Sequence, residues 1–283
     1  MFQENTLKGK TIIVTGGGSG LGFFMAKAMA KVGANIAICG RRESVLQSAK
    51  EELASMGCRA NAYTLDVRNY NEVESAFKQI ASDFGTIDGL INNAAGNFLS
   101  ASEDISPNGF KTVVDIVLHG TFNCTQNAAK YWIAKKQPGV ILNIVTTYTE
   151  TGCAFVLPSA CAKAGVYALT NTLAYEWATY NIRVNSIAPG PFPTEGAWSR
   201  LMPDSSFEST YLSNLPMKRY GKPEELTNLV VFLMSDMAPY ITGECISIDG
   251  GERLSAGMFN YMATQMPREN LKAAFAAMRS IKK

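Results

Sequence analysis

The chain has 283 residues, of which 47% are hydrophobic, so it holds enough apolar material for one sizeable core. Its 26 basic and 24 acidic residues are interspersed and give a formal net charge of +2, which excludes an extended nucleic-acid footprint. Six cysteines without a CxxC pair and a single histidine, His119, exclude the familiar zinc sites and any metal site built from them. We expect reduced, mostly buried thiols and a structural role for His119.

We expect no targeting signal from the two ends of the sequence. The first residues, M-F-Q-E-N-T-L-K-G-K, lack the apolar core of a signal peptide, and the last four carry no peroxisomal or retention tripeptide. No apolar run reaches the roughly 18 residues that indicate a membrane span. We therefore expect a cytoplasmic, soluble protein that binds neither a membrane nor a nucleic acid.

A glycine-rich loop stands near the start of the chain. The β-branched run Thr11–Thr15 predicts a strand, and G-G-G-S-G-L-G follows it before an apolar-periodic helix over 21–32. This order is the context of a dinucleotide site, because glycines let backbone N–H groups approach a pyrophosphate at a helix N-terminus. The loop residues expected to bind the cofactor are Gly16, Gly18, Ser19, Gly20, Leu21 and Gly22.

A second strand, over 35–39, ends in Gly40-Arg41-Arg42. An acidic residue here, about twenty residues beyond the loop, binds the ribose 2′-hydroxyl of NAD, whereas an arginine suits the 2′-phosphate of NADP. Because no acid is present, the sequence favours NADPH. The alternative is a pair of ordinary surface arginines at the start of the next helix.

Helical and strand patterns then alternate along the chain. The expected elements are helices over 43–56 and 71–84 and strands over 59–65 and 89–91. Alternation predicts an α/β fold, a doubly wound parallel sheet of about seven strands (a Rossmann fold), in a single domain over 1–283. Residues after the third and fourth strands should line the cofactor: Asp66 near the adenine, with Val67, Asn93 and Ala94.

The stretch Thr146–Lys163 follows a mostly helical segment over 107–136 and a buried strand over 140–145. Its side chains should lie at the carboxyl edge of the sheet, where ligands bind in open α/β folds. A cation, a hydroxyl and a phenol gathered there, Lys163, Thr146 and Tyr148, could polarise a carbonyl and pass a proton. The alternative is a polar loop with a solvated lysine.

The last third of the chain completes the pattern. A helix is expected over 159–180, a strand over 182–188, a helix over 224–235 and a strand over 245–249. Between them, 189–222 holds five of the eleven prolines without clear periodicity, which is typical of an excursion that covers a substrate. The tail, 253–283, contains an amphipathic helix candidate over 268–283 that could pack on another subunit.

The motifs T-G-G-G-S-G-L-G, N-N-A-A-G, A-K-A-G, P-G and D-G-G, in this order, resemble the short-chain dehydrogenase/reductase family over about residues 8–252. That family usually carries Y-x-x-x-K with a serine thirteen residues earlier. Here Lys163 is present, but Ser159 stands at the tyrosine position and Thr146 at the serine position. Val117 stands where a helix asparagine is usual.

One branch of the family, the 2,4-dienoyl-CoA reductases, is similar outside the cofactor motifs. The similar segments include N-N-A-A-G-N-F at 92–98, S-P-N at 106–108 and T-T-Y-T-E-T-G at 146–152. The resemblance implies that Tyr148 is the active-site phenol, Asn97 its hydrogen-bonding companion and Lys163 the nicotinamide-ribose ligand. By the same resemblance, further residues bind cofactor (Arg41, Pro189, Gly190, Phe192) or substrate (Arg68, Phe98, Ser106, Arg200).

This resemblance implies NADPH-dependent reduction of 2,4-dienoyl-CoA thioesters to 3-enoyl-CoA in unsaturated fatty-acid β-oxidation. It also implies a homotetramer, the usual assembly in the family. Two alternatives stay open. One is a 2-enoyl-CoA or 3-ketoacyl reductase of the same family, and the other is a non-catalytic NADP-binding sensor that lost its tyrosine.

Overall fold

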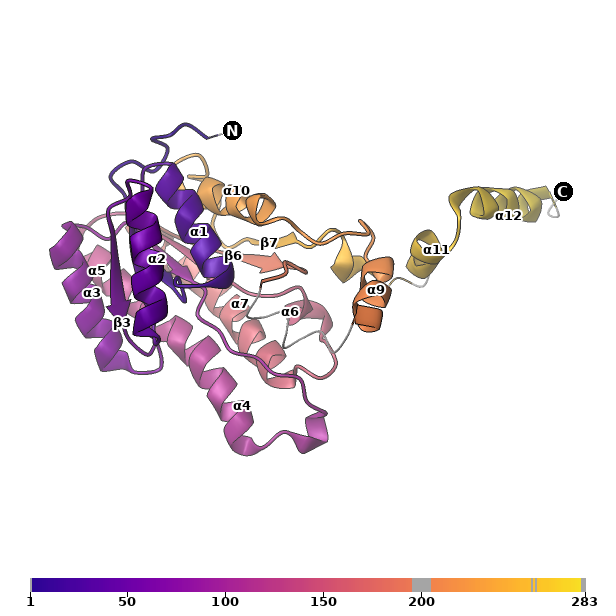
Figure 1. Cartoon of the computed structure of the whole chain (residues 1–283), viewed down its shortest axis with the longest axis horizontal. Helices are drawn as coiled ribbons and strands as arrows, with labels where there is room; N and C mark the ends of the chain where they lie inside the picture. Colours follow the sequence, from indigo (N-terminus) through magenta and orange to yellow (C-terminus); the bar gives the residue numbers. More distant parts are fainter. Residues whose placement is uncertain (1, 195–204, 256, 258, 281–283) are drawn as a thin grey trace.

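The structure is a computed structural model that describes residues 2–194, 205–255, 257 and 259–280. Its centre is a sheet of seven parallel strands in the order β3-β2-β1-β4-β5-β6-β7, which confirms the predicted doubly wound fold (Figure 1). The strands are β1 (Thr11–Thr15), β2 (Asn35–Gly40), β3 (Ala60–Thr64), β4 (Gly89–Asn92), β5 (Gly139–Ile144), β6 (Ile182–Pro189) and β7 (Cys245–Ile248).

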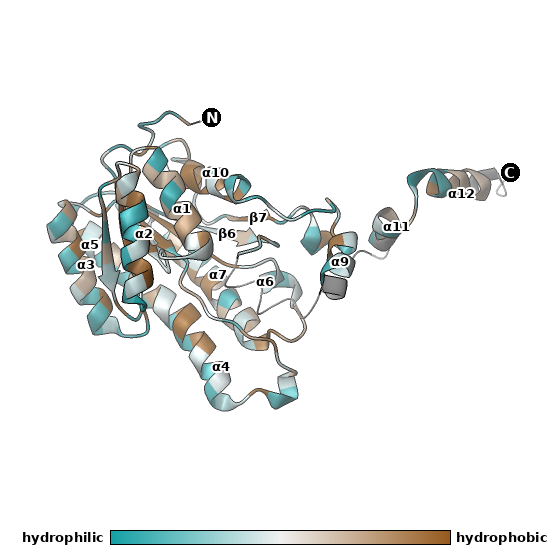
Figure 2. Cartoon of the chain, in the orientation of Figure 1, coloured by the Kyte–Doolittle hydropathy of each residue, from teal (hydrophilic) through white to brown (hydrophobic). Residues whose placement is uncertain are grey.

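Helices cover both faces of the sheet. The longer ones are α1 (Gly20–Lys31), α2 (Glu43–Ser55), α3 (Tyr70–Phe84), α4 (Pro107–Val114), α5 (Gly120–Lys135), α7 (Leu157–Trp177) and α10 (Pro223–Met234). Alternate strand residues serve opposite layers: Ile12 and Val14 pack with α1, α2 and α10, whereas Ile13 packs with α3 and α5. Because both faces are covered, the central strands β1 and β4 are buried along their whole length. Figure 2 shows that the covering helices carry both apolar and polar residues.

The strand order places the candidate site. From β1 the chain first builds outward through β2 and β3, then returns to the other side of β1 with β4. The connections after β1 and β4 therefore leave in opposite directions. A crevice opens at the carboxyl ends of these two strands, and in such folds it is the place where a dinucleotide binds.

The mostly helical segment predicted over 107–136 is confirmed as α4 and α5. Three local features were not predicted from the sequence. A π-helical turn at Asp115–His119 separates α4 from α5. Two further helices, α6 (Tyr148–Thr151) and α9 (Ser205–Asn214), lie in stretches without clear periodicity. Short 3-10 turns occupy 102–104, 178–180 and 252–254.

The C-terminal segment extends away from the body (Figure 1). It holds α11 (Asn260–Gln265) and α12 (Arg268–Ser280). On α12, Leu271 is buried, while Phe275 and Met278 are 43% and 63% exposed. No helix in the described part of the chain is long and apolar enough to cross a membrane.

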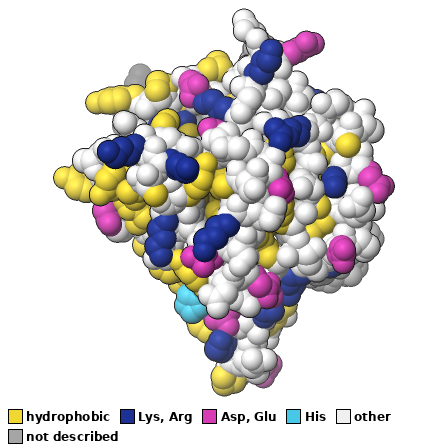
Figure 3. Space-filling view, turned by 90° about the vertical axis from the view of Figure 1, so that its left-hand side faces the viewer, with side chains coloured by type: hydrophobic (Ala, Val, Ile, Leu, Met, Phe, Trp, Pro, Cys, Tyr) yellow, Lys and Arg dark blue, Asp and Glu magenta, His cyan; other side chains and the backbone are white. Residues whose placement is uncertain are grey.

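Basic and acidic side chains are interspersed on the face shown in Figure 3. All six cysteines are free, as expected. The expectation that most of them are buried is wrong, because only Cys39 and Cys124 lie in the core, while Cys153 and Cys161 are exposed. These two lie on the 146–163 stretch beyond β5, where the chain has left the sheet.

Candidate active site

The glycine loop after β1 is folded tightly enough to receive a phosphate. Gly16 has φ +63° and donates its N–H to Cys39 O at 2.8 Å. A side chain at Gly22 would place its Cβ 2.3 Å from Gly16 O, so only glycine lets the helix begin this close to the loop. No side chain caps the first turn of α1 at Ser19. The N–H groups of that turn therefore suit a pyrophosphate, and the loop fits the dinucleotide predicted for it.

Two arginines flank this loop. Arg42 Nη2 lies 3.3 Å from Ser19 Oγ, which ties the end of β2 to the glycine loop. Arg41 is exposed beside it, and its charge helps to lower the pKa of Asp66. The sequence singled out Arg41 for the cofactor phosphate, and the structure adds Arg42 as its neighbour at the loop.

The end of β4 is tied to the end of β1. The backbone N–H groups of Asn93 and Ala94 both donate to Thr15 Oγ1 at 3.0 Å. Asn93 Nδ2 donates to Thr15 O at 3.0 Å and reaches Gly16 O at 3.3 Å. These bonds hold Asn93 and Ala94 against the first residues of the glycine loop, where the predicted cofactor contacts stay a prediction.

Beyond β3, Asp66 and Arg68 pair with each other. Arg68 Nε lies 3.0 Å from both carboxylate oxygens of Asp66. The Arg68 guanidinium holds the pKa of Asp66 below its usual range. Val67 is buried, and its carbonyl accepts a hydrogen bond from Asn123 Nδ2 at 2.9 Å. The structure thus pairs Asp66, which is expected near the adenine, with Arg68, which is expected to contact the substrate.

Phe98 and Ser106, two predicted substrate residues, come together at the start of α4. Ser106 Oγ accepts a hydrogen bond from Gly109 N at 3.0 Å and caps the helix. A Cβ built on Gly109 would lie 3.1 Å from Ser106 Oγ and 3.4 Å from Phe98 Cζ, so the phenyl ring rests against this turn. Arg200, the fourth predicted substrate residue, lies outside the described residues.

Tyr148 begins α6, directly beyond the carboxyl end of β5. The side chain is half-buried, and its hydroxyl lies 3.1 Å from Ser159 Oγ on α7. Burial raises the pKa of Tyr148, and the hydrogen bond with Ser159 opposes that change. The nearby Thr146 Oγ1 is buried without a hydrogen-bond partner in the described part of the chain. Such an atom is costly unless a ligand or water pairs with it.

Lys163 lies one helical turn after Ser159 on α7. It is 6% exposed, so the alternative of a solvated lysine is wrong. Its Nζ donates a hydrogen bond to Ile144 O at the end of β5. Burial lowers the pKa of Lys163 to about 8. The ammonium group therefore stands at the carboxyl edge of the sheet, fixed in place and close to titration at neutral pH.

Asn97 lies on the loop that follows β4. Its Oδ1 accepts the N–H of Phe98 at 2.9 Å, and its Nδ2 makes no hydrogen bond to any residue that the structure describes. The same loop reaches the segment after α6, because Ser100 N donates to Phe155 O at 3.0 Å. The chain thus brings the loop of Asn97 beside the segment of Tyr148 and leaves an amide donor available.

The segment after β6 closes the crevice from the other side. Gly190 N donates to Ile248 O at 3.0 Å, and a Cβ at Gly190 would lie 2.7 Å from Asp249 Cα. Pro191 O accepts from Gly221 N at 3.0 Å, and the Phe192 ring packs on Gly221. The two ends of the 189–222 segment are therefore joined at its base.

A buried polar network supports the floor of the site and was not predicted. Asn92 Nδ2 donates to Asn143 Oδ1 and to Thr125 Oγ1, both at 2.8 Å, and Asn143 Nδ2 donates to Thr170 Oγ1 at 2.9 Å. An asparagine near the end of each of two otherwise apolar strands, β4 and β5, is the signal that could have revealed it. The network links the strands under the crevice to α5 and α7.

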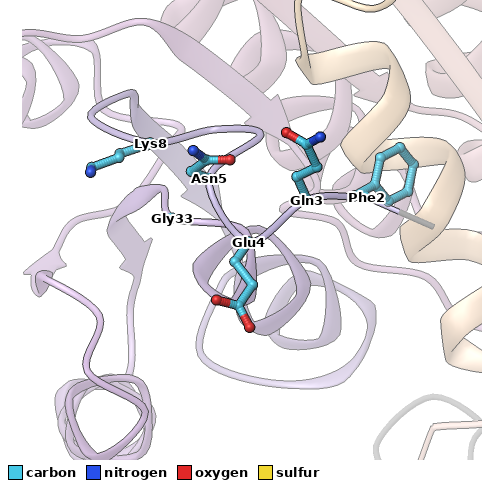
Figure 4. A pocket seen from close by; sticks show the side chains of 6 residues that line it. All are labelled: Phe2, Gln3, Glu4, Asn5, Lys8 and Gly33. Atoms are coloured by element: carbon cyan, nitrogen blue, oxygen red, sulfur yellow. The ribbon is translucent and has the colours of Figure 1, made fainter.

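A separate hollow of about 770 Å³ lies at the other edge of the sheet (Figure 4). Its lining residues are Phe2, Gln3, Glu4, Asn5, Lys8 and Gly33. Gly33 follows the end of α1, so this hollow is remote from the carboxyl edge. His119 is also apart from the crevice: it is exposed and lies 3.0 Å from Asp115 Oδ1 on its own helix.

Known proteins share this sequence and this fold. Residues 16–252 match the family described as enoyl-(acyl carrier protein) reductase. A probable (2E)-enoyl-CoA-producing 2,4-dienoyl-CoA reductase of Bacillus subtilis is 44% identical over 247 residues, which are 87% of this chain and 97% of the relative. The probable (3E)-enoyl-CoA-producing 2,4-dienoyl-CoA reductase 3 of Caenorhabditis elegans is 40% identical over 89% of this chain and 83% of the relative.

A solved structure agrees with the fold. The gluconate 5-dehydrogenase of Burkholderia cenocepacia, in complex with NADP and tartrate, superposes with a TM-score of 0.84 at 30% identity and covers 90% of this chain and 99% of that chain. The sequence match agrees with the family motifs found in the chain. The seven-stranded parallel sheet and the glycine loop agree with them too. The chain belongs to the short-chain dehydrogenase/reductase family.

Proposed function

We propose that this protein is an NADPH-dependent 2,4-dienoyl-CoA reductase that acts in unsaturated fatty-acid β-oxidation. The observation that carries the proposal is the hydrogen bond between Tyr148 and Ser159, one turn before the buried Lys163. It brings a phenol from a different element to the place where the family motif has its tyrosine. The relatives named 2,4-dienoyl-CoA reductase support the substrate class.

NADPH, when bound, supplies a hydride to the conjugated chain. On this account the N–H groups at the start of α1 receive its pyrophosphate, and Arg41 and Arg42 hold the 2′-phosphate that distinguishes it from NADH. Lys163 binds the nicotinamide ribose and keeps the local field positive. The family structure that contains NADP supports this choice of cofactor.

The position of the donors follows from where charge develops. Reduction at the far end of a conjugated dienoyl thioester sends negative charge through the double bonds to the thioester oxygen. Donors must therefore face that oxygen and not the carbon that is reduced. Tyr148 and the free amide of Asn97 hold the oxygen, and Tyr148, or a water that it positions, protonates the α carbon to give 3-enoyl-CoA.

The thioester itself is held by the polar and aromatic residues at the start of α4 and after β3. Phe98 and Ser106 lie together at the start of α4, and Arg68 offers a guanidinium after the end of β3. The acyl part is assigned to the 189–222 segment, in which Arg200 is the predicted substrate contact outside the described residues. The joined base of this segment, Pro191 with Gly221, supports a covering role for it.

We further propose a homotetramer. Apolar side chains are exposed on the long helices: Phe122 on α5 and Tyr175 on α7 are 45% and 91% exposed. Surface of this kind often marks a contact between protein chains. Mass photometry should give a species of four chains, and a monomer at micromolar concentration would contradict the assembly.

The direct test follows NADPH absorbance with 2,4-hexadienoyl-CoA, trans-2-hexenoyl-CoA and 3-ketohexanoyl-CoA. We expect rapid oxidation with the dienoyl thioester and little with the other two. Faster oxidation with the keto or mono-unsaturated thioester would assign the protein to the related reductases. NADPH binding without turnover of any thioester would indicate a sensor.

A further inference from the structure

Glu252 lies in a tight turn after β7, and the cofactor motifs give this residue no role. Asp249 holds the turn, since its Oδ1 accepts Gly251 N at 2.9 Å and its Oδ2 accepts Arg253 N at 2.9 Å. Gly250 and Gly251 have φ of +62° and +88°, values that side-chain-bearing residues rarely adopt. The turn therefore fixes where the Glu252 carboxylate points.

One oxygen of this carboxylate lies against the cofactor edge. A Cβ built on Gly190 would stand 3.1 Å from Glu252 Oε2, so the carboxylate rests over the bare backbone of Gly190. Gly190 belongs to the segment that we assign to cofactor binding. The negative charge is also near enough to Tyr148 to help raise the pKa of that phenol, after the larger effect of burial.

The other oxygen reaches the covering segment. Tyr211, on α9, donates its hydroxyl to Glu252 Oε1. The chain after α9 packs on the same turn, because Pro216 and Met217 lie 3.3 and 3.4 Å from Cβ positions built on Gly251 and Gly250. A single carboxylate thus contacts the cofactor edge on one side and the helix of the 189–222 segment on the other.

We propose that Glu252 is a positioning residue that connects the cofactor side of the site with the substrate side. Through Tyr211 it holds α9 over the acyl-thioester pocket, at a fixed position relative to Gly190. The inference rests on the proposed function, because it assigns α9 to substrate covering. A hydrogen bond to a charged group is among the stronger ones in proteins, so its loss should loosen α9 measurably. Burial raises the pKa of Glu252, and the hydrogen bond from the Tyr211 hydroxyl opposes this rise.

The test compares Tyr211→Phe with Tyr63→Phe. Each variant loses a hydroxyl that donates to a carboxylate, but Tyr63 donates to Asp83 at 2.7 Å, near the end of α3. We expect Tyr211→Phe to raise KM for 2,4-hexadienoyl-CoA about tenfold or more. Its Kd for NADPH, from fluorescence quenching, should stay within about twofold because Glu252 remains beside Gly190. Tyr63→Phe should leave KM unchanged.

Glu252 gives two further variants. Glu252→Gln keeps an oxygen that accepts from Tyr211 and should recover most of the KM, whereas Glu252→Ala should match Tyr211→Phe. The double variant Tyr211→Phe/Glu252→Ala should be no worse than either single one, because both remove the same bond. A KM for Tyr211→Phe equal to that of the wild type, or additive effects in the double variant, would overturn the coupling.

A readout without substrate separates this inference from the proposed function. Trypsin can cut after Arg219, close to the base of the covering segment, and we expect cleavage to be several-fold faster in Tyr211→Phe than in wild type or Tyr63→Phe. An inactive wild type with this pattern of cleavage would refute the reductase assignment and keep the contact. An active wild type with equal cleavage and equal KM in Tyr211→Phe would refute the contact's role alone.

Discussion

Tyr148 Oη and Ser159 Oγ lie 3.1 Å apart although the residues are eleven positions apart and belong to separate helices, α6 and α7. Ser159 stands at the position of the usual family tyrosine, one turn before Lys163. The phenol of Tyr148, which follows β5, therefore lies beside the position of the family tyrosine. The bond orients the phenol and partly offsets the rise in its pKa that burial causes.

Ser159→Ala should slow the reaction less than loss of the phenol itself. Removing one neutral hydrogen bond costs about 0.5–1.5 kcal/mol, so we expect kcat to fall by no more than about tenfold. The Ser159 bond lowers the pKa of Tyr148, so its loss should raise that pKa further. The phenolate absorbance of Tyr148, taken as the difference between Ser159→Ala and Ser159→Ala/Tyr148→Phe, should therefore appear at higher pH than the matching difference in the protein with Ser159. Appearance of the phenolate at lower pH in Ser159→Ala would contradict the assigned role of Ser159.

Lys163→Met should abolish turnover and alter the pH dependence of stability. Burial lowers the pKa of Lys163 from 10.5 to about 8, so between these values the unfolded chain binds more protons than the folded one. Wild-type stability should then rise with pH across this window relative to the variant. The difference of about 2.5 between the two pKa values corresponds to about 3 kcal/mol of unfolding free energy. Urea unfolding at pH 7 and pH 10 measures it; parallel curves would show that Lys163 is not desolvated.

Arg41→Ala tests the choice of cofactor. Without the guanidinium beside the end of β2, the 2′-phosphate loses a charge-assisted hydrogen bond, which is worth about 1.5–3 kcal/mol. We expect KM for NADPH to rise at least tenfold while KM for NADH stays nearly unchanged. Arg42→Ala, which also frees Ser19, is the matched comparison. If both variants changed KM for NADPH and KM for NADH equally, neither arginine would bind the 2′-phosphate.

The place of protonation distinguishes two products. The Bacillus relative is named for a (2E)-enoyl product and the Caenorhabditis relative for a (3E)-enoyl product. Because Tyr148 is assigned to the thioester end, we expect the solvent proton at the α carbon. Turnover in D₂O should therefore give 3-enoyl-CoA with one deuterium at C2 in its NMR spectrum. Deuterium at C4 with a 2,3 double bond would place the proton donor elsewhere.

The strands and the longer helices could be predicted from the sequence because their signals are local. The run Thr11–Thr15 is apolar and β-branched, and β1 has those same bounds. The glycine loop was predicted on the same local grounds. The helix predicted over 71–84 is α3, which Asn69 and Gly85 cap at its two ends.

The missing parts depend on contacts between distant residues. α9 has no clear apolar period, and its contacts reach distant residues, among them Glu252, which is forty-one residues after its partner Tyr211. The Asn92–Asn143 network likewise depends on two strands lying side by side. The motif resemblance predicts a role for Tyr148, whereas its hydrogen bond with Ser159 and the burial of Lys163 depend on how α6 and α7 pack.

The measurement closest to the central claim is kcat of Tyr148→Phe with 2,4-hexadienoyl-CoA and saturating NADPH. The variant keeps the ring and loses only the hydroxyl, so NADPH binding should be preserved. Loss of one donor to a developing oxyanion costs about 2.7–4 kcal/mol, and we expect kcat to fall by about 10²–10³. A variant as fast as the wild type would show that the phenol of Tyr148 neither holds the thioester oxygen nor delivers the proton.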